Sequence, residues 1–278
     1  MKIHFTKYHA LQNDFLVVES TKRLTGRTLP LLARKICHRR TGVGADGVLY
    51  LTGSKKADRK FIIYNSDGSW AEKSGNGLRI AGLHLHRKLK SKKEFSFETS
   101  NGIDSVTVVK KTKSDTQLMT SLGSPNFETR SVPVKSKKKV MINSELMINK
   151  LKFPVSCVSI GNPHTVLFVE NFDFDWKSLG QEIEFHKSFP ERTNVEFVRP
   201  VNRKKIRVAD WERGAGATGS SGTGAAAAVV IAVTMGITDR RCEVQFENGS
   251  LFINWNADNN IIELTGPVEF ITHGEYEY

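Results

Sequence analysis

The strongest constraint on how this chain folds is an internal duplication in its sequence. Ser74-Gly75-Asn76-Gly77 begins one run of helical pattern, and Ser221-Gly222-Thr223-Gly224 begins another 147 residues later in a chain of 278. Asn65 lies nine residues before the first motif, and Glu212 lies nine residues before the second. One duplicated unit explains these shared spacings, whereas chance would have to produce each separately. We therefore predict two similar halves.

The length of the chain also fits two domains. Its 278 residues exceed a typical single domain of roughly 100 to 200 residues, so each half could bury its own core. We predict an N-terminal half over residues 1–120 and a C-terminal half over residues 121–265. We expect the final segment, 266–278, to return to the first half.

Strand-like runs outnumber helical ones. The helical patterns cover 31–37, 77–90 and 224–235, and Gly236 after the last one suits a left-handed C-terminal cap. Alternating apolar and polar residues predict strands over 1–7, 15–19, 47–51, 61–64, 94–98, 105–109, 156–160, 165–169, 195–198, 205–209, 243–246, 251–255, 261–264 and 268–272. Runs of strands without strict strand–helix alternation are typical of an α+β fold.

The positive net charge of +12 indicates a basic surface rather than a nucleic-acid site. Its lysines and arginines gather in clusters far apart in the sequence, at 88–93, 135–139 and 203–205. The chain has no arginine-rich tail and no aromatic-interleaved RNA-binding signature. We therefore expect no nucleic-acid partner.

Cysteine usage and hydropathy favour a cytoplasmic protein. Cys37, Cys157 and Cys242 are odd in number, widely spaced and without a partner at zinc-ligand spacing, so we predict buried free thiols and no metal site. The longest apolar run, 225–233, is far shorter than the roughly 20 residues needed to cross a membrane. The N-terminus lacks the apolar core of a signal peptide.

The two Ser-Gly-x-Gly motifs predict binding of a small anion. Glycines let the backbone approach a ligand closely, and the unpaired N–H groups of a first helical turn attract negative charge. Two such helix starts facing each other across a cleft would hold a carboxylate and place one hydroxyl on each side of a carbon centre. Taken singly, each serine could equally be a helix cap contributing about 1 kcal/mol.

Several ordered motifs together make the chain resemble the diaminopimelate epimerase family over nearly its whole length. The matching segments are Asn13-Asp14-Phe15, Gly44-Ala45-Asp46-Gly47, Tyr64-Asn65-Ser66-Asp67-Gly68-Ser69, Ser74-Gly75-Asn76-Gly77-Leu78-Arg79, Gly161-Asn162-Pro163-His164, Thr193-Asn194-Val195, Glu212-Arg213-Gly214 and Ser221-Gly222-Thr223-Gly224. The resemblance implies two pseudo-symmetric domains, each a curved, mainly antiparallel sheet around a central helix, with the active-site cleft between them.

The same resemblance implies a function. Members of the family are isomerases of lysine and peptidoglycan biosynthesis that convert LL- into meso-diaminopimelate without metal or pyridoxal phosphate. Two cysteines act as opposed acid and base on one α-carbon. We accordingly expect a small-molecule amino-acid substrate, no cofactor, no membrane, and an assembly compatible with a homodimer.

This sequence departs from the family pattern at the reacting positions. Ser74 and Ser221 stand where the family has its catalytic cysteines. Other departures from the family pattern are Ile80 and Ala226, often cysteine in relatives, and Gln12 and Ala217, usually glycine and glutamate. A thiol ionises near pKa 8.5 and an aliphatic hydroxyl near roughly 15.7, so making the serine base costs on the order of 10 kcal/mol more. A plain serine pair should be nearly inert.

Three explanations of the serine pair stay open. The serines could be introduced replacements of cysteine, or the chain could be an inactive homologue that only binds the ligand. The third is altered chemistry, an isomerase or dehydratase reaction whose base is His164 or Glu212, because a serine can be activated by a neighbouring base.

The resemblance also assigns the remaining site residues. The catalytic positions are Ser74, Ser221, His164 and Glu212. The substrate contacts are Asn13, Asn65, Asn162, Asn194, Glu212 and Arg213, with Gly75, Asn76, Gly222 and Thr223 donating backbone N–H groups to the reacting carboxylate. A planar arginine fork suits a carboxylate.

One further motif is excluded as a nucleotide site. Residues 214–219 match the spacing G-x-G-x-x-G, and Asp239 lies 20 residues beyond its last glycine. A dinucleotide-binding fold would need further strand–helix repeats, but only hairpin-like strands follow.

Overall fold

The computed structural model describes residues 1–19, 28–71, 74–100, 102–111 and 116–278. The chain divides into two compact units, one formed by Met1–Ser121 with Thr265–Tyr278 and the other by Leu122–Leu264. Within the described ranges, no helix is both long enough and apolar enough to cross a membrane.

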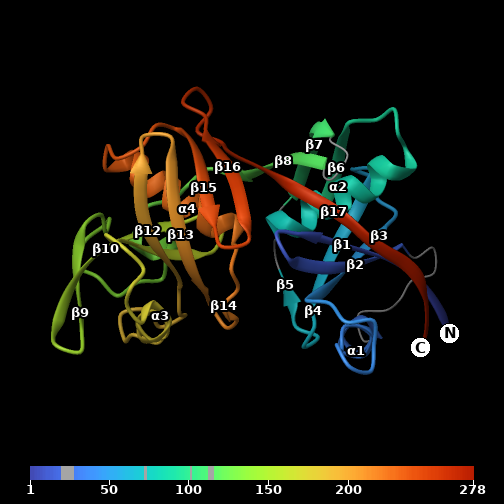
Figure 1. The fold of residues 1–278 in the computed structure, drawn as a ribbon, viewed down its shortest axis with the longest axis horizontal. Helices are drawn as coiled ribbons and strands as arrows, with labels where there is room; N and C mark the ends of the chain where they lie inside the picture. Colours follow the sequence, from blue (N-terminus) through green and yellow to red (C-terminus); the bar gives the residue numbers. More distant parts are fainter. Residues whose placement is uncertain (20–27, 72–73, 101, 112–115) are drawn as a thin grey trace. The chain divides into compact units, whose positions relative to one another are not determined.

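The first unit is a set of strands around one long helix. Its elements are β1 (Lys2–Ala10), β2 (Asn13–Glu19), α1 (Thr28–Ile36), β3 (Gly47–Thr52), β4 (Arg59–Asn65), β5 (Trp70–Ala71), α2 (Gly75–Lys88), β6 (Glu94–Thr99), β7 (Gly102–Lys111), β8 (Thr116–Gly123) and most of β17 (Ile262–Glu277), which pairs antiparallel with β1. Helix α2 packs against β1, β2, β3, β6 and β7 and is buried from Gly75 to His86, so it is the central helix (Figure 1).

The second unit repeats this plan. Its elements are η1 (Thr129–Ser131), β9 (Ser144–Ile148), β10 (Leu151–Ser159), β11 (Pro163–Phe168), α3 (Trp176–Glu184), β12 (Asn194–Asn202), β13 (Lys205–Glu212), β14 (Gly216–Ala217), α4 (Gly222–Thr234), β15 (Arg241–Phe246) and β16 (Gly249–Trp255). Helix α4 packs against β10, β11, β12, β13, β15 and β16 and is buried from Gly224 to Ala232, as α2 is in the first unit (Figure 1).

Both units share one pattern of strand pairing. In the first unit, β2 runs parallel to β3, while β1–β2, β3–β4 and β6–β7 are antiparallel and β4–β6 is parallel. In the second unit, β10, β11, β12, β13, β15 and β16 pair in the same order and directions. Even the register repeats at the offset of 147, because Val48 pairs with Tyr64 and Val195 with Trp211. The predicted α+β fold of two pseudo-symmetric, mainly antiparallel halves is confirmed.

The glycine predicted to end the second central helix does so. Gly236 has φ 73°, the left-handed conformation that glycine adopts without strain. Its N–H donates to the Val233 carbonyl at 2.9 Å, and the Ile237 N–H donates to the Ala232 carbonyl at 2.8 Å. This pair of bonds forms a Schellman cap and satisfies carbonyls that α4 would otherwise leave unpaired.

Of the elements in the described residues, the sequence patterns miss α3, β8 and β9, and also the short β5, β14 and η1. Helix α3 buries only Gly180, Ile183 and Glu184, so its apolar stripe is too thin to reveal a helix from the sequence. Its start is marked by Asp175, whose side chain accepts a hydrogen bond from the Ser178 N–H at 3.1 Å. The capping residue was therefore the better signal for α3.

The prediction of two separate strands over 261–264 and 268–272 is wrong. The structure has one continuous strand, β17, which runs through Pro267. Proline lacks an N–H and normally interrupts a ladder. β17 pairs with β1 from Glu269 to Glu277 and also with β8. Pro267 lies outside the part that pairs with β1, so it removes no hydrogen bond from that ladder.

Candidate active site

Ser74 forms the N-terminal cap of α2. Its backbone is extended, with φ −143° and ψ 115°, and its hydroxyl accepts a hydrogen bond from the Gly77 N–H at 3.0 Å. Ser74 is half-buried, whereas Gly75 and Asn76 are buried. The N–H groups of Gly75 and Asn76 precede the first complete turn, so they have no intrahelical acceptor and can bind an anion.

A chain of hydrogen bonds holds Asn76 and Asn13 in place. The Asn76 amide donates to Asn13 Oδ1 at 3.1 Å, and the Asn13 amide donates to Asp46 Oδ2 at 2.9 Å. Arg79, fully buried one turn along α2, donates from Nη2 to Asn76 Oδ1 at 2.7 Å and from Nη1 to the Gly75 carbonyl at 3.1 Å. Both ends of each amide are engaged, so the start of α2 is rigidly positioned.

Asn65 lies outside this chain of bonds. It ends β4, its side chain is exposed, and its amide donates to Ser69 Oγ at 2.9 Å. The start of α2 and the start of β2 thus bring together four of the predicted site residues of the first unit, Asn13, Ser74, Gly75 and Asn76. Asn65 instead bonds within the turn that follows β4.

Ser221 caps α4 in the same way but is more enclosed. Its hydroxyl accepts from the Gly224 N–H at 3.1 Å, and only 3% of the residue is exposed. The same hydroxyl acts as a hydrogen-bond donor toward the Glu212 carboxyl at the end of β13. Burial raises the pKa of Glu212, with hydrogen bonds from Thr218 and Ser221 opposing the rise. Ser221 therefore has a potential proton acceptor beside it.

His164 lies beneath α4, fully buried between two acceptors. Its Nδ1 is 2.6 Å from Glu196 Oε1, and its Nε2 is 2.9 Å from Asn162 Oδ1. The Asn162 amide in turn donates to Thr223 Oγ1 at 3.3 Å, which leaves Asn162 Oδ1 facing the imidazole. The contacts run from β11 through Asn162 to the first turn of α4.

Two acidic side chains, Asp210 and Glu212, meet at Thr218. The Thr218 hydroxyl lies 2.8 Å from Asp210 Oδ2 and also hydrogen-bonds to Glu212 Oε1. Asp210 is 1% exposed, and its Oδ1 has no hydrogen-bond partner. Burial and then the nearby Glu212 charge raise the pKa of Asp210 well above its ordinary value.

Asn194 and Arg213 are joined through the backbone. The Asn194 amide donates to the Pro163 carbonyl at 2.7 Å, and its Oδ1 accepts from the Arg213 N–H at 2.9 Å. Arg213 itself is exposed, with Nη1 donating to the Glu191 carbonyl at 3.2 Å. Asn194 thus shapes the segment that carries Arg213.

The second unit brings together Asn162, His164, Glu212, Ser221, Gly222 and Thr223.

Sequence reasoning missed Glu196, Asp210, Thr218 and Arg79. Glu196 and Asp210 sit at inward positions of β12 and β13, where a single acidic residue in a strand is normally taken to face solvent. Only the packing of α4 over these strands makes both positions interior. Within the described residues, no group of three or more His, Cys, Asp or Glu side chains is placed to hold a metal ion.

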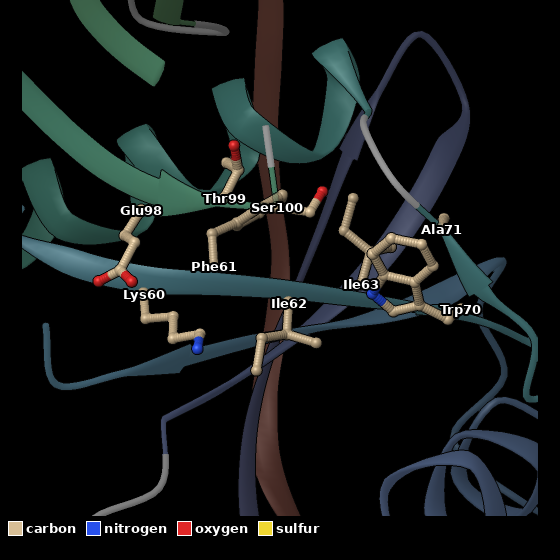
Figure 2. Close-up of a pocket in the computed structure, with 9 residues that line it drawn as sticks. All are labelled: Lys60, Phe61, Ile62, Ile63, Trp70, Ala71, Glu98, Thr99 and Ser100. Carbon is tan, nitrogen blue, oxygen red and sulfur yellow. The ribbon is translucent and has the colours of Figure 1, made fainter. Parts of the chain in front are cut away.

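A separate cavity of about 290 Å³ opens in the first unit where β4 changes partner from β6 to β5. Its lining comes from β4, β5 and the end of β6, as Figure 2 shows, with residues Lys60, Phe61, Ile62, Ile63, Trp70, Ala71, Glu98, Thr99 and Ser100. None of the predicted site residues lines it.

Known proteins of one family match this chain over nearly its whole length. A model of the diaminopimelate epimerase family matches residues 5–127 and 156–271. The diaminopimelate epimerase of Caldanaerobacter subterraneus subsp. tengcongensis is 39% identical over 277 residues, covering 99% of this chain and 100% of that protein. That of Carboxydothermus hydrogenoformans is 40% identical over 278 residues, covering 99% of each.

A solved structure of lower identity has the same fold. The crystal structure of a hydroxyproline epimerase from Agrobacterium vitis aligns with a TM-score of 0.70 at 11% sequence identity. The alignment covers 99% of this chain and 91% of that one. At this identity the likeness supports the fold alone.

Proposed function

The chain belongs to the diaminopimelate epimerase family, and we propose that it converts LL- into meso-diaminopimelate as a cofactor-independent epimerase. The observation that supports this most is the duplicated Ser-Gly-x-Gly helix start, capped by Ser74 in one unit and by Ser221 in the other. Each sits where first-turn N–H groups can bind a carboxylate. In this proposal both half-sites act on one substrate, from opposite faces of its α-carbon.

Substrate binding uses the backbone at the reacting end and side chains at the far end. Gly75, Asn76, Gly222 and Thr223 donate N–H groups to the reacting α-carboxylate. These donors also stabilise the negative charge that develops when the α-proton leaves. The distal amino-acid end is bound by side chains that include Asn13, Asn65, Glu212 and Arg213, while Asn162 and Asn194 position neighbouring segments.

The proton acceptor in the second unit is the Glu212 carboxylate, acting through Ser221. The Ser221 oxygen receives the α-proton as its own hydroxyl proton passes to Glu212, so the charged product of this step is a substrate carbanion and Ser221 does not become an alkoxide. At Ser221 this route avoids the cost, on the order of 10 kcal/mol, of ionising serine in place of cysteine. Ser74 occupies the opposite acid position: its hydroxyl gives a proton to the carbanion, and water then returns a proton to the Ser74 oxygen.

A second candidate function is an inactive protein that binds diaminopimelate. The observation that favours it is the absence of sulfur at both reacting positions, since hydroxyls are far weaker acids than thiols. Such a protein would keep the helix-start N–H donors and lose proton transfer only.

One experiment separates these functions. The protein is incubated with LL- and meso-diaminopimelate in deuterated water, and loss of the α-proton is followed by NMR beside a Ser74→Cys/Ser221→Cys double variant. We expect slow exchange by the unmodified protein and faster exchange by the double variant. Exchange by the double variant alone, or binding without exchange by either, would contradict the proposed activity and support the binder.

The proposal extends to location and assembly. Cys37, Cys157 and Cys242 are free and buried, as predicted, which suits the reducing cytoplasm. We also propose that the protein can form a homodimer. Sedimentation of the purified protein at several concentrations measures its assembly directly.

A further inference from the structure

The duplication reveals which polar side chains the fold itself does not require. Glu196 pairs with Asp210 across β12 and β13, and at the matching positions of the first unit Leu49 pairs with Ile63. In the same way His164 pairs with Asn194, where the first unit pairs Phe15 with Gly47. Thr218, just after β14, matches Ala71 at the end of β5.

The first unit therefore builds the same architecture with apolar residues at four of these positions. Its Phe15, Leu49 and Ile63 belong to one hydrophobic core cluster, and Ala71 packs against it. The second unit places His164, Glu196, Asp210 and Thr218 there instead. Burying polar groups is unfavourable unless they are fully hydrogen-bonded, so these four side chains weaken the core that they replace. Their presence calls for a chemical reason.

The buried oxygens of this cluster are not fully satisfied. Glu196 and Asp210 are each 1% exposed, and Glu196 Oε2 and Asp210 Oδ1 have no hydrogen-bond partner. An unpaired carboxylate oxygen in the interior is more costly than an unpaired oxygen of a neutral carboxylic acid. Glu196 and Asp210 lie opposite each other on the adjacent strands β12 and β13. The interior thus favours a protonated carboxyl in this cluster.

Counting hydrogens at Thr218 leads to the same conclusion. The Thr218 hydroxyl carries one hydrogen but contacts both Asp210 Oδ2 and Glu212 Oε1. If both carboxyls were ionised, one contact would bring two acceptors together without a hydrogen. Both contacts are hydrogen bonds when Asp210 is protonated and donates to the Thr218 oxygen, while Thr218 donates to an ionised Glu212.

The surroundings decide which carboxyl keeps the proton. Asp210 faces Glu212 on its own strand β13 and Glu196 on β12, with His164 of β11 bonded to the far side of Glu196. Both carboxyls contact Thr218, but Glu212 is also hydrogen-bonded by Ser221, whereas Asp210 Oδ1 has no partner. Hydrogen bonds to the charged form stabilise it, so Glu212 is the ionised member and Asp210 the protonated one.

We propose that Asp210 is a positioning residue for the proposed epimerase reaction: together with Thr218 it holds one proton and thereby keeps Glu212 ionised and fixed beside Ser221. This inference rests on the proposed function. The singly ionised pair is the active form, because only that form keeps both bonds to Thr218. At higher pH a second ionisation breaks one bond, and repulsion moves Glu212 away from Ser221. Proton transfer through Glu212 then slows.

Two substitutions of Asp210 separate positioning from titration. Asp210→Asn keeps a neutral donor to Thr218 that cannot ionise, so we expect near-normal exchange at neutral pH and no decline at alkaline pH. Asp210→Ile installs the side chain of the first unit and removes the donor. We expect its kcat for α-proton exchange to fall by about tenfold, part of the roughly 10²–10⁴ that a positioned base contributes, with little change in KM.

Thermal unfolding distinguishes this role from a structural one. Asp210→Ile should raise Tm, because the same backbone position in the first unit carries a buried isoleucine. An aspartate retained for folding would lower Tm when replaced. Glu145→Gln, a change of an exposed carboxyl on β9 of the same unit, serves as the control and should alter neither Tm nor the pH profile.

A readout independent of activity keeps the inference separate from the proposed function. In protein labelled with 13C at the aspartate carboxyls, we expect one resonance to remain protonated well above the ordinary aspartate range and to vanish in Asp210→Asn. Ordinary titration of that resonance, or an Asp210→Ile variant with unmodified rate and pH profile, overturns the inference. If neither the unmodified protein nor any variant exchanges the α-proton while the protonated resonance is present, the proposed function is contradicted. The inference that Asp210 and Thr218 hold one proton is then still supported.

Discussion

A serine hydroxyl can stand in for a thiol only if another group takes its proton. Ser221 meets this condition, because its hydroxyl accepts from Gly224 and donates toward Glu212. Burial raises the pKa of Glu212, which makes its carboxylate a stronger base than an exposed one. At the scale of single residues, the chemistry of the second half-site therefore depends on Glu212 more than on Ser221.

Replacing Glu212 tests that dependence. Glu212→Gln keeps the size of the side chain and removes the proton acceptor, so we expect α-proton exchange to fall by roughly 10²- to 10⁴-fold. NMR exchange in deuterated water measures the rate. Glu182→Gln, an exposed position on α3, is the matched control and should exchange normally. Equal rates for Glu212→Gln and the unmodified protein would remove Glu212 from the mechanism.

At the scale of elements, an ion-pair network ties β2 to α2. The carboxylate of Glu19 lies 2.5 Å from His84 Nε2 and also pairs with Lys88, and the hydrogen bond from His84 contributes most to lowering the pKa of Glu19 to about 2. A carboxyl whose pKa is lowered by folding stabilises the folded state above its unfolded pKa. That stability is lost as the pH falls through the folded pKa.

Glu19→Gln should therefore destabilise the protein in a pH-dependent way. We expect a loss of about 2 to 3 kcal/mol in the free energy of unfolding at pH 7, from a shift of roughly two pKa units. Near pH 2 the unmodified protein has lost most of this contribution, so the two proteins should converge. Urea denaturation at both pH values gives the comparison. A difference of equal size at both would show that the charge of Glu19 is not responsible.

The two ends of α4 respond differently to an added methyl group. At Gly236 a Cβ meets no atom within 4 Å but φ is 73°, so Gly236→Ala should cost about 1 kcal/mol of stability by backbone strain and leave exchange unchanged. At Gly224 a Cβ would lie 3.0 Å from Glu196 Oε1 and from Ser221 Cβ. Gly224→Ala should therefore slow exchange. Urea denaturation and exchange rates are measured on both variants. Slower exchange in Gly236→Ala, or normal exchange in Gly224→Ala, would contradict this expectation.

At the scale of the whole molecule, the duplication was the most predictable property. The two Ser-Gly-x-Gly motifs and Gly236 are local signals, because capping and left-handed φ depend on a few adjacent residues. Those signals placed the central helices, whereas the α+β fold was predicted from the runs of strand-like pattern. The roles of the site residues remain predictions, since each unit is described by itself and carries only some of these residues.

What the sequence could not reveal depends on packing between distant segments. Glu196 and Asp210 are recognisable as a buried pair only once β12 and β13 are in register beneath α4. Pro267 could be placed within a strand only once the pairing partner of β17 was known. Comparison of the two halves position by position would have identified both acids as departures from an apolar core.

The central claim is that the two duplicated half-sites share one substrate. A crystal structure of the protein with diaminopimelate measures this most directly. We predict one bound molecule whose α-carbon lies between the Ser74 and Ser221 hydroxyls, with its carboxylate on the N–H groups of both helix starts. Diaminopimelate bound by one helix start alone, with the other serine facing a separate surface, would contradict the account.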